Sequence, residues 1–147
     1  MPYKELNLDS QLCFRLYTAS RLVVHCYQPF LEKVNLTYLQ YIVMMVLWEK
    51  DRVSVGEISH RLMLESNTIT PLLKRMEKEQ LILREKGKKD MRKTIVSLTK
   101  KGKQLEKKAI EIPLCMSNSL LNKNISSQEL LTMIPFLDKM ILCLKNE

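Results

Sequence analysis

Hydrophobic residues recur at helical spacing from the start of the chain. In the first part the spacing is carried by Leu12, Leu16, Leu22 and Val23. It predicts a first helix that Asp9 or Ser10 can cap and that Pro29 kinks or interrupts. The next segment, YLQYIVMMVLWE at 38–49, is almost continuously apolar. We therefore expect a second helix, capped by Thr37 and buried on most sides.

Two shorter amphipathic segments follow. Ser54 and Glu57 have the S-x-x-E spacing of a capping box and predict a short helix with the sequence VGEISHRLML. After the polar turn ESN, the sequence TITPLLKRMEKEQ predicts another helix with one apolar face. The sequence allows two starting points for this helix. Either Ser66 caps it, or Thr70 caps it with Pro71 at the first helical position, where the missing N–H costs nothing.

The pattern then changes from helical to strand-like and back. LILRE and TIVSLT are rich in aliphatic and β-branched residues, and the charged loop KGKKDMRK joins them, which predicts a β-hairpin with a basic tip. Thr99 can cap a long helix toward Asn118 with a kink at Pro113. Ser126 and Glu129 form a second capping box before LLTMIPFLDKMILCLK. The predicted fold is mostly α with a small β-hairpin.

Composition limits the class of protein. A chain of 147 residues with 46% hydrophobic content favours one domain with a real core. Its apolar runs fall short of the roughly 18 residues of a membrane span, and the first residues, MPYKELNLDS, are too polar for a signal peptide. We expect a cytoplasmic protein whose four cysteines are reduced thiols unless oxidation is regulated. They are Cys13, Cys26, Cys115 and Cys143.

The positive charge is concentrated in one third of the chain. The net charge is +8, yet residues 74–108 contain fourteen Lys and Arg against five Asp and Glu, a net +9. The remaining residues contain ten against eleven, a net −1. A basic block beside a near-neutral remainder indicates a surface that binds a polyanion, and nucleic acid is the expected partner.

Two short helices, a tight turn and a basic hairpin are the parts of a winged helix-turn-helix, whose second helix enters the DNA major groove. On their own, the polar residues of that helix would be interpreted as caps and a solvated face; the adjacent basic hairpin favours DNA contact. From this helix the candidates for base and phosphate contacts are Ser66, Asn67, Thr68, Thr70, Lys74 and Arg75. From the hairpin they are Lys86, Lys88, Lys89, Asp90, Arg92 and Lys93.

Asp90 and Arg92 stand two residues apart and can share one side of an extended strand. Asp90 is then placed to orient Arg92. A guanidinium held in this way suits the narrow, negatively charged minor groove.

The segment LTYLQYIVMMVLWEK, with TPLLKRME, the tip DMRK and SLTKKGK downstream, resembles the MarR family of winged-helix repressors over nearly the whole chain. The resemblance implies a single domain that forms a homodimer on double-stranded, pseudo-palindromic DNA. Residues of about 37–100 would form the DNA-binding region, and about 8–34 and 101–147 the dimerisation helices. It also implies that Arg92 is the arginine of the wing tip.

Within that family, LCFRLY near the N-terminus resembles the OhrR branch of peroxide sensors. The resemblance implies that Cys13 is the reactive thiol and that Tyr17, Tyr27 and Tyr38 supply the hydroxyls that stabilise its thiolate. Fourteen residues separate Cys13 from Tyr27, which is about 21 Å along a helix. Contact between them therefore requires two subunits. The resemblance also implies that Cys115 of the opposite subunit is the resolving thiol.

Other interpretations compete with the redox sensor. A cysteine on an apolar helix face is more often a small hydrophobic residue, and the three matching tyrosines are what favour a sensor here. A repressor that responds to a small aromatic ligand is the alternative within the family. An enzyme is not expected, because the sequence has no C-x-x-C motif and no nucleophile with an evident base. No cofactor is expected, and no ligand pair has zinc spacing.

Overall fold

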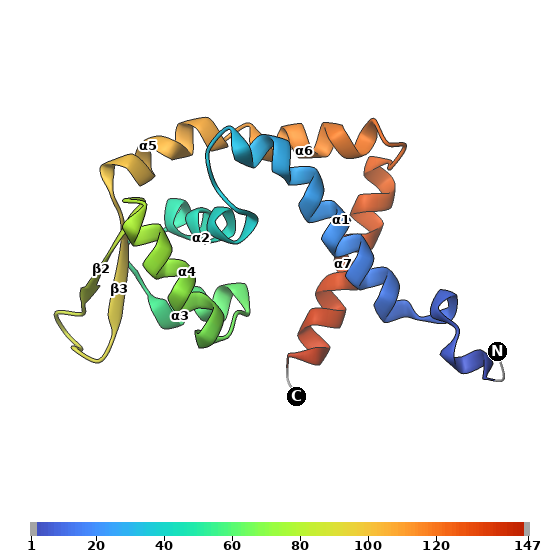
Figure 1. Ribbon diagram of the computed structural model, residues 1–147, viewed down its shortest axis with the longest axis horizontal. Coiled ribbons are helices and arrows are strands. Elements are labelled where there is room, and N and C mark those ends of the chain that lie inside the picture. Colours follow the sequence, from blue (N-terminus) through green and yellow to red (C-terminus); the bar gives the residue numbers. More distant parts are fainter. Residues whose placement is uncertain (1–2, 146–147) are drawn as a thin grey trace. The chain divides into compact units, whose positions relative to one another are not determined.

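The computed structural model describes residues 3–145, which form two compact units, one up to Glu111 and one from Ile112 onward (Figure 1). Each unit has its own arrangement and is described by itself. The single domain expected from the sequence stays a prediction.

The first unit contains five α-helices, a three-stranded sheet and two short 3-10 turns that precede the first helix. The helices are α1 (Leu12–Glu32), α2 (Tyr38–Glu49), α3 (Val55–Leu62), α4 (Ser66–Lys78) and α5 (Lys100–Ala109). The strands are β1 (Val53–Ser54), β2 (Ile82–Lys86) and β3 (Thr94–Leu98). This mostly helical fold with a small antiparallel sheet confirms the predicted fold class.

Local capping determines where several of these helices begin. Thr37 and Gln40 form a complete capping box at α2, and the Thr99 hydroxyl accepts a hydrogen bond from the Gly102 N–H at α5. The Ser54 hydroxyl accepts from the Glu57 N–H at α3, as predicted. In each case the interacting groups lie three residues apart, so the sequence alone could place them.

The predicted cap of α1 is wrong. Asp9 and Ser10 lie in a 3-10 turn, and α1 begins after Gln11, whose side chain does not cap the helix. Pro29 lies inside α1, which continues to Glu32. Because Leu31 is buried in that last turn, its packing outweighs the backbone hydrogen bond that proline removes.

Neither predicted start of α4 is observed. Ser66 is the first helical residue, and the backbone carbonyl of Glu65 accepts from the N–H groups of Thr68 and Ile69. Pro71 lies in the helix interior instead of the first position. The tight left-handed turn at Met63 ends α3 and fixes where the next helix can begin.

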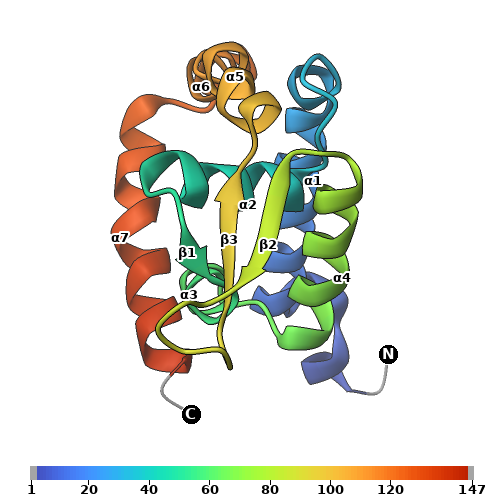
Figure 2. The ribbon, with the colours of Figure 1, turned by 90° about the vertical axis from the view of Figure 1, so that its left-hand side faces the viewer.

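The core lies between α2, α3, α4 and one face of the sheet. The strand order is β1-β3-β2, and all pairs are antiparallel (Figure 2). Val96 at the centre pairs with Val53 on one side and with Arg84 on the other. The two-residue strand β1 was not predicted. The fully buried side chains are Val43, Met44, Leu47, Ile58, Ile69, Leu73, Met76, Ile82 and Val96.

The second unit contains α6 (Ile112–Leu121) and α7 (Ser127–Leu144). The single helix predicted between Thr99 and Asn118 is therefore divided, with Pro113 in the first turn of α6, where it removes no intrahelical bond. The Ser126–Glu129 capping box at α7 is confirmed.

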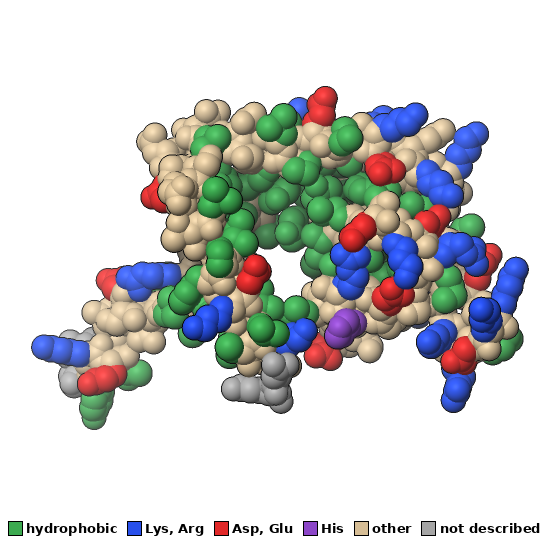
Figure 3. Space-filling model, turned by 180° about the vertical axis from the view of Figure 1, so that it is seen from behind, with side chains coloured by type: hydrophobic (Ala, Val, Ile, Leu, Met, Phe, Trp, Pro, Cys, Tyr) green, Lys and Arg blue, Asp and Glu red, His purple; other side chains and the backbone are tan. Residues whose placement is uncertain are grey.

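Helix α7 has no buried residue, and apolar side chains along it are open to solvent in this single chain (Figure 3). The largest include Leu131, Ile134, Phe136, Ile141 and Leu142. Within residues 3–145, no helix is both long enough and apolar enough to cross a membrane.

Candidate nucleic-acid interface and thiol site

Helix α4 has one buried face and one polar face. Ile69, Leu72, Leu73 and Met76 anchor the buried face in the core. The opposite face contains the predicted DNA-contacting residues. Thr70 is half-buried, and the others are exposed: Ser66, Asn67, Thr68, Lys74 and Arg75. The core therefore presents the start of α4 as a row of small hydrogen-bonding groups followed by two cations.

An ion pair connects α4 to the hairpin. Glu77 Oε2 accepts from Arg84 Nε at 3.1 Å and from Arg84 Nη2 at 2.8 Å, and Glu77 Oε1 accepts from the Arg84 backbone N–H at 3.0 Å. The Arg84 side chain holds the pKa of Glu77 below its ordinary value; burial opposes this effect, and the Arg84 N–H and charge lower the pKa further. The sequence analysis missed this pair, because no local pattern relates residues that contact across two elements.

The hairpin loop between β2 and β3, the wing, is closed by backbone contacts. The Gly87 N–H donates to the Lys93 carbonyl at 2.9 Å, and the Lys93 N–H donates to the Asp90 carbonyl at 3.1 Å. A Cβ at Gly87 would lie 2.5 Å from that Asp90 carbonyl oxygen, so only glycine fits there without a shift. The loop thus has a defined shape.

The predicted contact between Asp90 and Arg92 is confirmed. Asp90 Oδ1 accepts from the Arg92 N–H at 3.0 Å and from Arg92 Nε at 3.3 Å. The two residues meet in a turn instead of on one side of a strand. The Arg92 side chain is 93% exposed, so its guanidinium is oriented by Asp90 yet open to a ligand.

Figure 2 shows the start of α4 and the wing at the same end of the first unit. A cavity of about 430 Å³ lies between them and the start of α3. Its lining includes Thr70 of α4, Arg84 of β2, and Arg92, Lys93 and Thr94 at the end of the wing. Lys86, Lys88 and Lys89 are also exposed. The structure therefore brings the predicted residues Thr70, Arg92 and Lys93 to one cavity, and the other predicted cations of α4 and the wing are exposed.

Asp51 holds the sheet to the start of α5. Its Oδ1 accepts from the Leu98 N–H at 2.8 Å and from the Arg52 N–H at 2.9 Å, and its Oδ2 lies 3.3 Å from Lys103 Nζ. Partial burial alone would raise the pKa of Asp51, but these backbone donors and Lys103 lower it. The sequence analysis missed this role, since Leu98 is 47 residues away.

The predicted thiol site is divided along α1. Cys13 is exposed at the start of the helix, and Tyr17, one turn further on, is 69% exposed. Tyr27 lies near the other end, where its ring centroid is 5.2 Å from that of Tyr38 and 6.1 Å from that of Tyr41. Since α1 is one helix from Leu12 to Glu32, Cys13 does not meet Tyr27 within one chain.

Burial, and secondarily the neighbouring phenol of Tyr38, raise the pKa of Tyr27. Burial also raises the pKa of Tyr41, followed by the effects of Tyr27 and Tyr38. The phenols of Tyr27 and Tyr41 therefore stay protonated at neutral pH and keep an O–H to donate. Tyr41 was not among the predicted site residues, because its place in the apolar 38–49 segment marked it as core.

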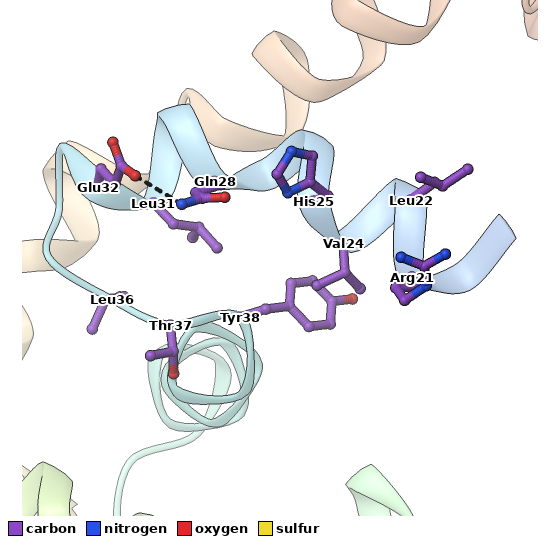
Figure 4. Close-up of a pocket in the computed structure, with 10 residues that line it drawn as sticks. All are labelled: Arg21, Leu22, Val24, His25, Gln28, Leu31, Glu32, Leu36, Thr37 and Tyr38. Atoms are coloured by element: carbon purple, nitrogen blue, oxygen red, sulfur yellow. Dashed lines mark hydrogen bonds between the residues drawn. The ribbon is translucent and has the colours of Figure 1, made fainter. Parts of the chain in front are cut away.

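A cavity of about 640 Å³ lies between α1 and the start of α2 (Figure 4). Arg21, His25 and Gln28 of α1 face Thr37 and Tyr38 across it. Apolar side chains, Leu22, Val24, Leu31 and Leu36, form much of the remaining wall.

The other cysteines lie elsewhere. Cys115 is half-buried in α6, Cys26 is half-buried in α1 and Cys143 is exposed in α7. All four cysteines are free thiols. Among the described residues, no group of three or more His, Cys, Asp or Glu side chains is arranged to hold a metal ion.

A three-stranded sheet with a wing between β2 and β3, beside the exposed second helix of a helix-turn-helix, defines the class: this is a winged helix-turn-helix protein. The family described as transcriptional regulator SarA/Rot matches residues 25–109. The chain belongs to this family, whose members are winged-helix regulators of MarR type.

Individual relatives agree with this assignment. The organic hydroperoxide resistance transcriptional regulator of Bacillus subtilis (strain 168) is 42% identical over 111 residues, 76% of each chain. Solved structures of AbfR, a protein of Staphylococcus epidermidis, are also similar. Reduced AbfR bound to DNA has a TM-score of 0.78 and 33% identity, covering 98% of this chain and 99% of AbfR. Disulfide-formed AbfR has a TM-score of 0.61 and 32% identity, covering 97% and 93%. The family consists of regulators, not enzymes.

Proposed function

We propose that this protein is a homodimeric, cytoplasmic repressor that places α4 of each subunit in the major groove of double-stranded DNA. The observation that carries the proposal is the position of α4 beside the basic wing, where Thr70, Arg92 and Lys93 line one cavity. Ser66, Asn67 and Thr68 supply donors and acceptors for base edges and phosphates, and Lys74 and Arg75 neutralise phosphates. Arg92, oriented by Asp90, enters the adjoining minor groove.

Exposed apolar surface supports the homodimer. Apolar side chains are open along α7 and also along the first half of α1, where Leu12, Phe14 and Leu22 are exposed. Large contiguous apolar surfaces mark interaction sites. A symmetric dimer would present two copies of α4 about 34 Å apart to half-sites one helical turn apart, which matches a pseudo-palindromic operator.

The oxidation of Cys13 is the proposed signal. The Cys13 thiolate attacks an organic hydroperoxide or hydrogen peroxide: an S–O bond forms, the O–O bond breaks, and an alcohol or water leaves. Phenols of the partner subunit's Tyr27 and Tyr38, with Tyr17 of the same helix, would donate hydrogen bonds to the thiolate. The close packing of Tyr27 on Tyr38 and the exposure of Cys13 support this arrangement.

A second thiol would complete the switch. The Cys115 thiolate of the opposite subunit attacks the sulfur of the Cys13 sulfenic acid: an S–S bond forms, the S–O bond breaks, and the hydroxide leaves as water after it takes a proton from solvent. Such a bridge would tie α1 of one subunit to α6 of the other and change the spacing of the two α4 helices. The likeness to disulfide-formed AbfR supports a disulfide in this branch of the family.

The test combines a non-reducing gel with DNA binding before and after peroxide. Wild type should form a covalent dimer and lose DNA affinity; Cys13→Ser and Cys115→Ser should form none. Cys143→Ser is the matched control and should behave as wild type. A covalent dimer that persists without Cys115 would refute the resolving role, and unchanged peroxide release in Cys13→Ser would refute the sensor.

The cavity between α1 and α2 favours a second candidate, a repressor released by a small aromatic ligand. Its apolar walls, the Tyr38 ring, the Arg21 guanidinium and the His25 imidazole suit an aromatic acid. Salicylate is a suitable first probe. If it releases the Cys13→Ser protein from DNA while peroxide has no effect, this candidate replaces the redox sensor; Arg21→Gln should then weaken the response.

A further inference from the structure

One face of the wing contains a basic hollow whose lysines are among the predicted DNA-contacting residues of the hairpin. Its volume is about 560 Å³, and it extends from the wing to the turn that precedes β1. We call it the wing-base hollow. Five cations line it: Arg52, Lys86, Lys88, Lys89 and Lys93.

Arg52 comes from outside the wing and was not among the predicted DNA-contacting residues. Its backbone has a φ of 61°, in the left-handed region, and its N–H donates to Asp51 Oδ1 at 2.9 Å. Asp51 is itself bound to the Leu98 N–H and to Lys103. The backbone of Arg52 is therefore fixed against β3 and α5, while its exposed side chain lines the hollow.

The hollow has an excess of uncompensated positive charge. Its five cations face two carboxylates, Glu85 and Asp90, and the latter is already paired with Arg92. Within residues 3–145, none of the five cations forms an ion pair with a carboxylate. Neighbouring like charges raise the free energy of the unbound protein, and an anion seated among them would relieve this repulsion.

Glu85 and Ile95 place part of this hollow on the face of the hairpin turned away from α4, and Lys93 lines both this hollow and the cavity beside α4. Successive strand residues point to opposite faces. Arg84 and Thr94 line the cavity shared with α3 and α4, whereas their neighbours Glu85 and Ile95 line the wing-base hollow. Since Lys93 connects this hollow to the cavity beside α4, DNA that continues past the half-site along the wing can reach the hollow.

We propose that the wing-base hollow binds backbone phosphates of the DNA flanking the half-site, with Arg52 as its fixed cation. This inference rests on the proposed DNA-binding function. It predicts that the protein contacts more DNA than its two α4 helices and wing tips require, and that the additional contacts are independent of sequence.

Two labelled duplexes test the inference. One is a core duplex of about 20 base pairs, two half-sites long, selected from a random library by the wild-type protein. The other is the same core extended by about ten base pairs of mixed sequence at each end. The length is about that of one further minor-groove repeat. Wild type should bind the extended duplex more tightly and with a steeper salt dependence.

Arg52→Gln should lower affinity for the extended duplex about tenfold and reduce its log–log salt slope by about one per subunit. Affinity for the core duplex should stay within about twofold, and Arg52→Lys should retain most of the effect. Lys107→Gln is the matched control, because Lys107 is an exposed cation of α5, at the end of the sheet opposite the wing (Figure 2).

Each outcome has a distinct meaning. If Arg52→Gln weakens both duplexes equally, or neither, the flanking site is refuted while DNA binding stands. If wild type selects no duplex, the proposed function fails and this inference fails with it. Thermal denaturation shows whether Arg52→Gln is folded. A variant that failed to fold would lose its affinity for the core duplex as well.

Discussion

Replacing Glu77 with Gln tests how much the ion pair between α4 and β2 stabilises the folded protein. The substitution keeps the side-chain length and one acceptor for the Arg84 N–H, but it places an NH₂ group or a neutral oxygen opposite the guanidinium. Two charge-assisted hydrogen bonds, of 3.1 and 2.8 Å, lose their ionised acceptor.

The magnitude follows from the exposure of the pair. Hydrogen bonds to charged groups contribute about 1.5–3 kcal/mol when buried, whereas exposed ion pairs contribute about 0.2–1 kcal/mol. The side chains of Arg84 and Glu77 are 24% and 34% exposed. Solvent screening therefore reduces the buried value, and we expect a loss of about 1–2 kcal/mol in the free energy of unfolding at pH 7.

The effect should depend on pH in one direction. The pKa of Glu77 is lower in the folded protein than its ordinary value of 4.5. The stabilisation is therefore complete above the unfolded-state pKa and is lost as the pH falls through the folded-state value. The difference between wild type and Glu77→Gln should be constant near neutrality and should shrink below about pH 4.5.

Urea denaturation at fixed protein concentration measures this difference, because dimerisation makes apparent stability concentration-dependent. With a slope of about 2 kcal/mol per M, the midpoint should fall by about 0.5–1 M at pH 7. Glu106→Gln, an exposed carboxylate of α5, is the control and should change stability by less than about 0.5 kcal/mol. A Glu77→Gln midpoint equal to wild type, or a difference independent of pH, would refute the reasoning.

Three further predictions follow from single contacts. Gly102→Ala places a Cβ against a backbone carbonyl and should destabilise the protein by about 1–3 kcal/mol in thermal denaturation, whereas Gly56→Ala, whose Cβ would make an ordinary contact with Ser54 Oγ at 3.9 Å, should not. Arg92→Ala should weaken DNA binding by about 1–3 kcal/mol in fluorescence anisotropy, and Asp90→Asn should cause a smaller loss; equal losses would refute the orienting role. Tyr27→Phe should slow peroxide oxidation of the sensing thiol about fivefold, the value of one hydrogen bond, and an unchanged rate of sulfenic acid labelling would exclude that hydroxyl.

The sequence by itself determined the features whose partners are close along the chain. The caps at Thr37, Thr99 and Ser126 each join groups three residues apart, and the two strands of the wing are neighbours in sequence. The contact of Asp90 with Arg92 spans two residues. For such features, residue type and spacing suffice, because the chain has few other conformations that satisfy the same hydrogen bonds.

Only the tertiary structure decided what distant segments do together. Glu77 with Arg84, and Asp51 with Leu98, meet because the core packs α4 and the sheet against each other. The same packing fixes Arg52 beside the wing and brings Tyr27 onto Tyr38. The start of α4 also depends on how α3 ends, not on its own cap residues. No periodic sequence pattern predicts these contacts. The burial of apolar surface determines which segments pack together, and the polar side chains then form the hydrogen bonds that this packing allows.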